Sequence, residues 1–241
     1  MNLLIGGKMA SAQILIVFDC DGTLADSQHI ITEAMRFAFQ STGLVAPERS
    51  SVLRIVGLSL DEAATALAPD QCQAKRDEVV RVFHEWSATL RLNASAREPL
   101  FPGAASLLQK LAEREDVILG LATGKSRRSV ARIIEQNDLR GIFTTIQTAD
   151  EAPSKPHPAM LFQAMEETGA SPETTVMIGD TSYDIQMAVA ANVASIGVSW
   201  GYHTVAELRR AGAKRIVHSF AELASTLDGG AVFAQPYEAV A

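Results

Sequence analysis

The sequence predicts an α/β fold, in which a parallel β-sheet carries helices on both faces and a separate helical segment is inserted near its start. Three observations lead to this prediction. From residue 102 onward, short apolar segments alternate with helical stretches, which implies parallel strands joined by right-handed crossovers. Residues 27–97 contain helix-like segments only. The apolar run 14–18 ends in two acidic residues and a glycine, as expected for a buried strand that reaches the ligand-binding edge of such a sheet.

Six strands are expected in the α/β core, which we assign to residues 13–26 and 98–228. The first strand is 14–18, and the others lie near 117–122, 143–148, 175–179, 194–198 and 215–217. Helices are expected near 103–114, 126–137, 157–168, 183–190, 204–211 and 219–226. This regular alternation is typical of a sheet that is covered on both faces.

The insertion, residues 27–97, is expected to hold three helices, near 27–42, 59–68 and 71–91, separated by glycines and prolines. The two ends of the chain show little pattern. We expect a flexible N-terminal extension over residues 1–12 and a loosely held C-terminal tail over residues 229–241.

The first chemical motif follows the strand 14–18, in the run Asp-Cys-Asp-Gly-Thr at residues 19–23. Two carboxylates this close, Asp19 and Asp21, are unfavourable in a buried place unless a cation or a phosphorylated group balances their charge. The alternative is a polar strand end that feeds a glycine turn. Cys20 between them is expected to be small buried packing.

Two further strand ends carry residues suited to an anion. Thr123 ends the second strand, and its hydroxyl and the backbone amides around Gly124 and Lys125 can donate hydrogen bonds to phosphoryl oxygens. A helix-capping threonine is the alternative. Lys155 follows the third strand beside Pro156, whose ring stiffens the backbone so that the ammonium can be aimed at a negative site. The alternative for Lys155 is an exposed loop lysine.

The fourth motif is a second pair of acids, Asp180 and Asp184, after the strand 175–179. If a helix starts near Thr181, these two side chains lie one turn apart and face the same way. Hard carboxylate oxygens at this spacing suit Mg²⁺. A helix cap at Asp180 and a solvated Asp184 form the alternative interpretation.

In this order, the four motifs resemble those of the haloacid dehalogenase-like (HAD) hydrolase superfamily, over nearly the whole chain. The resemblance implies a Rossmann-like core, with the helical insertion as a mobile cap. It also implies that Asp19 is the catalytic nucleophile and Asp21 the catalytic acid/base. Thr123, Gly124 and Lys155 would bind the substrate phosphate, with Thr123 and Lys155 assisting catalysis.

The same resemblance implies a Mg²⁺ cofactor held by Asp19, Asp180 and the backbone carbonyl of Asp21, with Asp184 acting on the metal directly or through a water. The closer likeness is to phosphoglycolate phosphatase-like members, through Asp-Gly-Thr-Leu (21–24), Phe-Pro-Gly (101–103), the Lys-Pro-x-Pro form and Gly-Val-x-Trp-Gly-Tyr (197–202). The function implied is hydrolysis of a small phosphomonoester, phosphoglycolate or a similar metabolite, through an aspartyl-phosphate intermediate.

Other functions remain open. A phosphomutase of the same superfamily would use the same core. That branch resembles Gly-x-Ser-Arg in the cap, and this chain has Leu60 in place of the arginine. The branch also places a histidine shortly after the first motif, where this chain has Ile31. A dehalogenase is disfavoured because that branch lacks the second aspartate, present here as Asp21. A non-catalytic binding module on this fold is the alternative from a different class.

Composition restricts the partners. The formal net charge of −7 argues against nucleic acid. No apolar run reaches the ~18 residues of a membrane span, and the N-terminus lacks the apolar core of a secretory signal. Two cysteines, Cys20 and Cys72, do not make a disulfide framework, so the expected location is the cytoplasm. For substrate selection, Arg54 could contact an anionic group, with an exposed structural arginine as the alternative. Gln28 and His29 could line the entrance to the site, with a solvated helix face as the alternative.

Overall fold

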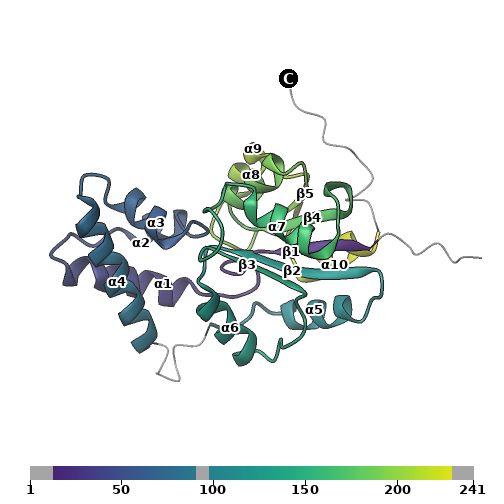
Figure 1. Ribbon diagram of the computed structural model, residues 1–241, viewed down its shortest axis with the longest axis horizontal. Helices are drawn as coiled ribbons and strands as arrows, with labels where there is room; N and C mark the ends of the chain where they lie inside the picture. Colours follow the sequence, from purple (N-terminus) through teal and green to yellow (C-terminus); the bar gives the residue numbers. More distant parts are fainter. Residues whose placement is uncertain (1–12, 91–97, 230–241) are drawn as a thin grey trace, which may run out of the picture.

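The computed structural model describes residues 13–90 and 98–229. The sheet and its covering helices form one body, and four helices near the start of the chain form a lobe beside it (Figure 1). The α/β fold class is thus confirmed. The predicted N-terminal extension 1–12, most of the predicted tail 229–241 and the end of the predicted insertion, residues 91–97, lie outside the described residues. The predicted domain boundaries therefore stay predictions.

The sheet has six parallel strands in the order β3-β2-β1-β4-β5-β6. These strands are β1 (Ile14–Phe18), β2 (Val117–Thr123), β3 (Thr145–Thr148), β4 (Thr175–Gly179), β5 (Ala194–Val198) and β6 (Arg215–Val217). β1, β2 and β4 are the central strands, and their side chains are almost all apolar and buried because helices cover both faces. All strands run the same way, so their carboxyl ends meet at one edge.

Three helices cover each face of the sheet (Figure 1). On one face, α5 (Ala104–Ala112), α6 (Arg127–Gln136) and α10 (Phe220–Asp228) pack on residues such as Phe18 and Leu121. On the other face lie α7 (Ala159–Thr168), α8 (Ser182–Ala190) and α9 (Val205–Ala211), with α7 and α8 against Leu15, Val17 and Met177. A short 3₁₀ turn, η1 (Pro172–Thr174), precedes β4. Alternate residues of β1 enter opposite layers, as the two-residue period of a strand requires.

The lobe beside the sheet, which we call the cap, consists of α1 (Gln28–Ser41), α2 (Arg49–Arg54), α3 (Leu60–Leu67) and α4 (Gln73–Leu90). Its own apolar centre includes Met35, Phe39, Val52 and Val79. The sequence did not predict α2, since six residues are too few to show a helical period. None of the described helices is both long and apolar enough to cross a membrane.

The cap meets the core at the carboxyl edge of the sheet. The Ser59 backbone N–H donates to Ser154 Oγ at 2.8 Å, just before Lys155. On the other side, Arg54 Nη2 lies 2.6 Å from Glu207 Oε1, and the Arg54 carbonyl lies 3.0 Å from His203 Nε2. Gly124 in the core packs so closely on the cap that a Cβ atom there would lie 2.8 Å from the Gly57 carbonyl oxygen and overlap that of Leu58. The cap is therefore in direct backbone contact with the core loop that follows β2.

This contact predicts the effect of Gly124→Ala. The added methyl group collides with cap backbone rather than with a side chain that could move aside, so the cap must retreat. We expect amide hydrogen exchange at Ser59 to become several-fold faster, because its hydrogen bond to Ser154 stretches or breaks. Gly229→Ala is the matched control, since its Cβ would meet nothing closer than 3.4 Å. Unchanged exchange at Ser59 in Gly124→Ala would show that this contact does not hold the cap.

Candidate active site

Neighbouring strands deliver the candidate residues to one place. Phe18 of β1 is level with Leu121 of β2 and Ile178 of β4. Asp19 directly follows β1, Thr123 ends β2, and Asp180 directly follows β4, so their side chains gather at the same edge. Asp19 is more than a hundred positions from the other two residues in the sequence, and Thr123 and Asp180 are nearly sixty positions apart. The predicted convergence of strand ends is therefore observed.

Asp19, Asp180 and Asp184 form a buried acidic cluster. One side-chain oxygen from each lies within 4.8 Å of the others. All three side chains are buried, Asp180 and Asp184 completely. Asp184 enters from the first turn of α8, where its Oδ2 accepts hydrogen bonds from the Thr181 backbone N–H at 3.0 Å and hydroxyl at 2.7 Å. A solvated Asp184 is thereby excluded.

Lys155 supplies the positive charge of this cluster. Its Nζ lies 2.6 Å from Asp19 Oδ1 and 2.6 Å from Asp184 Oδ1. The side chain is fully buried, which excludes the exposed loop lysine that the sequence left open. Burial lowers the pKa of Lys155, but the carboxylates of Asp184 and Asp19 outweigh this and raise it above its usual value, so the ammonium stays charged.

Burial raises the pKa values of two acids of the cluster, Asp19 and Asp180. Removal from water, together with repulsion from the neighbouring Asp184 and Asp21 carboxylates, raises the pKa of Asp19 to about 7, although the ammonium of Lys155 acts to lower it. Burial, followed by repulsion from Asp184 and Asp19, raises the pKa of Asp180 well above its usual value. One lysine therefore does not compensate the cluster, and these carboxylates need a further cation to remain ionised together.

The cluster fits a divalent metal such as Mg²⁺. Asp19 Oδ2 is buried and accepts no hydrogen bond from the described residues. Asp180 is oriented by the Thr23 hydroxyl at 2.8 Å on Oδ1 and the Tyr202 backbone N–H at 2.8 Å on Oδ2. Three carboxylates and one ammonium leave two negative charges when all are ionised, which one divalent cation would balance. Carboxylate oxygens are the ligands that Mg²⁺ prefers.

Asp21 points elsewhere. Its Oδ1 lies 2.8 Å from Lys125 Nζ, and Lys125 Nζ also lies 2.7 Å from Glu98 Oε1. Lys125 and Glu98 are both buried. Burial lowers the pKa of Lys125, but Asp21 and Glu98 raise it above its usual value. The Asp21 carboxylate is not one of the three in the acidic cluster, and a metal contact through its backbone carbonyl stays a prediction.

Sequence reasoning missed this second ion group, which we call the Asp21–Lys125–Glu98 triad. Lys125 was considered only as a backbone donor, and no motif marked Glu98. No sequence signal marks this group, because most glutamates and lysines are exposed and Glu98 and Lys125 lie 27 positions apart.

The two remaining phosphate candidates, Thr123 and Gly124, lie at the end of β2, directly before Lys125 of the triad. Thr123 is buried, and its Oγ1 accepts a hydrogen bond from the Lys125 backbone N–H at 3.2 Å, which leaves its hydroxyl hydrogen free to be donated. Gly124 follows it under the cap backbone. α6 begins only at Arg127, with Ser126 as its cap, so Thr123 is not a helix cap. Its role in phosphate binding stays a prediction.

The three residues suggested for substrate selection are placed differently from the prediction. Arg54 pairs with Glu207, its side chain is 67% exposed, and it does not line the cavity next to Asp21. Gln28 hydrogen-bonds to Asp26 and Arg49, and His29 is exposed. The turn of α1 brings Ile31, rather than Gln28 or His29, to that cavity.

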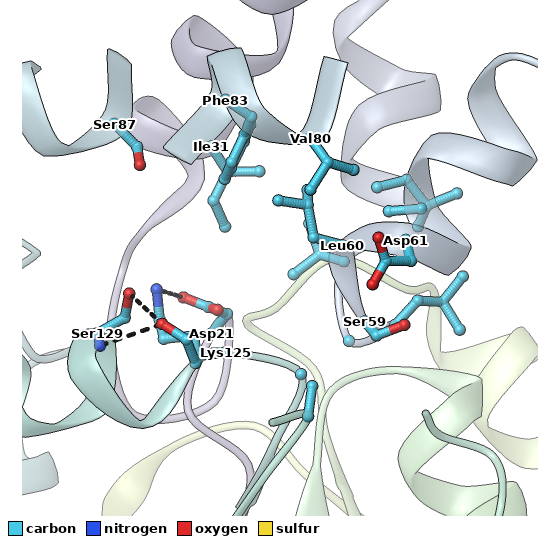
Figure 2. A pocket seen from close by; sticks show the side chains of 18 of the residues that line it. Asp21, Ile31, Ser59, Leu60, Asp61, Val80, Phe83, Ser87, Lys125 and Ser129 are labelled. Carbon is cyan, nitrogen blue, oxygen red and sulfur yellow. Dashed lines mark hydrogen bonds and ion pairs between the residues drawn. The ribbon is translucent and has the colours of Figure 1, made fainter. Parts of the chain in front are cut away.

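That cavity, of about 160 Å³, lies between the cap and the core and begins at Asp21 and Gly124 (Figure 2). In the view of Figure 2, Asp21 and Lys125 lie at the bottom and the cap side chains project toward them. The acidic cluster, Thr123 and this cavity thus follow one another along the edge of the sheet. The arrangement suits a reaction centre with a binding space beside it.

Comparison with known proteins gives a consistent result. The family model described as haloacid dehalogenase-like hydrolase matches residues 16–198. The "Probable phosphatase IndB" of Dickeya dadantii is 33% identical over 212 residues, which span 87% of this chain and 91% of that protein. The "Phosphoglycolate phosphatase" of Photorhabdus laumondii is 29% identical over 217 residues, 88% of this chain and 91% of that protein.

The solved structures agree. A crystal structure of a predicted phosphatase from Clostridium acetobutylicum superposes with a TM-score of 0.80 and 26% sequence identity. The match covers 91% of this chain and all of that one. Cap and core are therefore arranged much as in an experimentally determined relative.

The fit of the acidic cluster to a divalent metal predicts a thermal shift. At a Mg²⁺ concentration a hundredfold above the dissociation constant, binding stabilises the folded protein by about 2.7 kcal/mol, which raises Tm by roughly 5–10 °C for a chain of this size. Asp180→Asn should lose most of this shift in differential scanning fluorimetry. Asp61→Asn, at an exposed cap position, is the control and should keep it. A wild-type Tm that does not respond to Mg²⁺ would contradict the assignment.

Proposed function

The chain belongs to the haloacid dehalogenase-like hydrolase family, and from this premise we propose that it is a Mg²⁺-dependent phosphatase that hydrolyses a small phosphomonoester through an aspartyl-phosphate intermediate. One observation carries the proposal: Asp19, Asp180, Asp184 and Lys155 converge at the carboxyl edge of the sheet, with one oxygen of Asp19 unengaged by the described residues. Phosphoglycolate, named for one relative, is one candidate substrate.

In this mechanism, Asp19 attacks the phosphorus atom and forms the aspartyl-phosphate. Lys155 pairs with Asp19 Oδ1 and so orients the Asp19 carboxylate at the end of β1. Covalent catalysis divides one displacement into two easier steps. A bound Mg²⁺, held by Asp19, Asp180 and Asp184, would neutralise phosphoryl charge and reduce its repulsion of the incoming carboxylate. Lys155 and the Thr123 hydroxyl stabilise the equatorial oxygens by charge and hydrogen bonding.

Asp21 is the general acid and base of the two steps. It protonates the leaving oxygen when the ester bond breaks and removes a proton from the water that later hydrolyses the aspartyl-phosphate. Lys125 acts through Asp21 as a positioning residue, because an ion pair of 2.8 Å fixes the orientation of that carboxylate beside the cavity. The cap covers the reaction and limits the access of bulk water.

Hydrolysis is favoured over mutase chemistry by the cap. A mutase must retain and turn a substrate that carries a second phosphate, which calls for cationic side chains in the cap. Ile31 and Leu60 occupy the positions of the histidine and the arginine of the mutase branch. Both residues line the cavity, and both are apolar.

The two cysteines bear on the location of the protein. Buried Cys20 and exposed Cys72 are both unpaired, which supports a cytoplasmic location.

Asp19→Asn tests the nucleophile. Replacing the attacking oxygen by an amide should lower Mg²⁺-dependent hydrolysis of p-nitrophenyl phosphate on the order of 10³-fold or more, as removal of a nucleophile does elsewhere. The variant should still unfold cooperatively, since it also relieves charge repulsion in the acidic cluster. No radiolabelled phosphoenzyme should be trapped from it. Turnover close to wild type in the purified variant would remove Asp19 from this role.

Lys125→Met tests the positioning of Asp21. General acid catalysis is worth typically ~10²–10⁴-fold, and it matters for alkyl esters but little for p-nitrophenol, which leaves without protonation. We therefore expect kcat/KM, which reports the steps up to cleavage of the ester bond and not the dephosphorylation common to both esters, to fall far more for ethyl phosphate than for p-nitrophenyl phosphate. Lys110→Met, at an exposed position of α5, is the control.

The variant removes the cation beside buried Glu98, which can cost about 3–5 kcal/mol of stability. If Lys125→Met does not fold, Lys125→Met with Glu98→Gln removes both charges and carries the same expectation. Equal losses on the two esters would show that Lys125 is structural only.

A further inference from the structure

The cavity between cap and core opens at the position where the leaving group must lie. On the core side it is bounded by Asp21, Gly124 and Lys125. In the proposed mechanism Asp21 meets the bridging oxygen of the ester. The part of the substrate beyond that oxygen therefore enters this cavity, and the chemistry of its walls selects the alcohol.

The cap supplies an apolar wall. Ile31 comes from α1, Leu60 from α3, and Val80 and Phe83 from α4. Figure 2 shows Ile31 and Phe83 above the Asp21–Lys125 pair, with Val80 and Leu60 to the right of them in this view. Ile31, Leu60 and Phe83 also pack against the apolar centre of the cap, which holds them in place. This wall favours contact with carbon rather than with charge.

The charges at the cavity do not favour an anionic leaving group. Among the described residues of the lining, Lys125 and His84 are the basic side chains, against three carboxylates, and the Lys125 ammonium already lies within 2.8 Å of carboxylates of Asp21 and Glu98. Asp61 and Asp150 carry the other two carboxylates of the lining. A carboxylate or second phosphate placed here would lie against aliphatic side chains and near several acids, an arrangement that is strongly unfavourable without a cation of its own.

The size of the cavity limits the leaving group. An apolar cavity of about 150 Å³ holds a benzene molecule, and this one measures about 160 Å³. Ser59 and Ser129 at its border could bind one or two hydroxyl groups of a ligand. The space thus fits a single six-membered ring or an alkyl group of similar volume.

We propose that this cavity selects phosphate esters whose leaving group is an uncharged, largely apolar alcohol of about the size of a six-membered ring, and that it disfavours esters bearing a carboxylate or a second phosphate, phosphoglycolate included. This proposal rests on the proposed phosphatase activity. It assigns the cap side chains Ile31, Leu60, Val80 and Phe83 as the specificity-determining wall.

Three alkyl esters test it with the full-length, Mg²⁺-loaded enzyme: phosphoglycolate, ethyl phosphate and cyclohexyl phosphate. Each buried methylene contributes a factor of about two to four, so kcat/KM for cyclohexyl phosphate should exceed that for ethyl phosphate at least about tenfold. Phosphoglycolate should be the poorest of the three. Its alcohol is more acidic than cyclohexanol and leaves more readily, so the reversed order must arise from binding.

Two variants on one helix separate the wall from general packing. Leu60 and Leu67 lie on α3, both partly buried and both packed on the cap centre, but only Leu60 lines the cavity. Leu60→Ala should lower the cyclohexyl-to-ethyl ratio of kcat/KM about three- to tenfold, whereas Leu67→Ala should leave the ratio unchanged. If Leu60→Ala does not fold, Val80→Lys replaces it, and should raise kcat/KM for phosphoglycolate relative to cyclohexyl phosphate at least about tenfold.

Each outcome has one meaning. A wild-type preference for phosphoglycolate over cyclohexyl phosphate, or the same ratio in Leu60→Ala as in wild type, overturns the proposed selectivity and leaves the phosphatase activity standing. Absence of Mg²⁺-dependent phosphate release from all three esters and from p-nitrophenyl phosphate overturns the phosphatase proposal itself. The nitrophenyl ester therefore tells the two failures apart.

Discussion

Repulsion among three buried carboxylates is the constraint on which the rest of this structure depends. Asp19, Asp180 and Asp184 lie within 4.8 Å of one another, an arrangement that water would screen but that the protein interior does not. Lys155 reaches two of the three acids and offsets part of the repulsion. The remaining negative charge makes the site receptive to a divalent cation and, with it, to a phosphoryl group. β1 and β4 are neighbours in the sheet, and this adjacency brings Asp19 and Asp180, which directly follow them, close together.

The Asp21–Lys125–Glu98 triad is a second buried group of charges, separate from the acidic cluster. Asp19 and Asp21 are two residues apart, yet Asp19 pairs with Lys155 and Asp21 with Lys125. Because each carboxylate has its own cation, the two can take different roles, attack on phosphorus and proton transfer to the leaving oxygen. Lys125 is shared with Glu98, so the orientation of Asp21 depends on the segment that returns from the cap to the core. Asp21, the acid and base of the proposed mechanism, is thus tied to the junction between the cap and the core.

The cap completes the site from the other side. Its backbone meets the core at Gly124, where any side chain would interfere, and its apolar side chains face the triad across a small cavity. The charged side chains of the site therefore come largely from the strand ends, and the apolar side chains of the cavity come from the cap helices.

The sequence by itself determined the parallel sheet, the positions of its strand ends and the convergence of Asp19, Thr123 and Asp180, because strand periodicity and turn residues are local properties and the carboxyl ends of parallel strands must meet. It also placed Asp180 and Asp184 on one side of a helix start. Only the tertiary structure decided which charges pair. Lys125 with Glu98 and Arg54 with Glu207 are distant in sequence. The folding of the core brings the first pair together, and the packing of the cap on the core brings the second pair together.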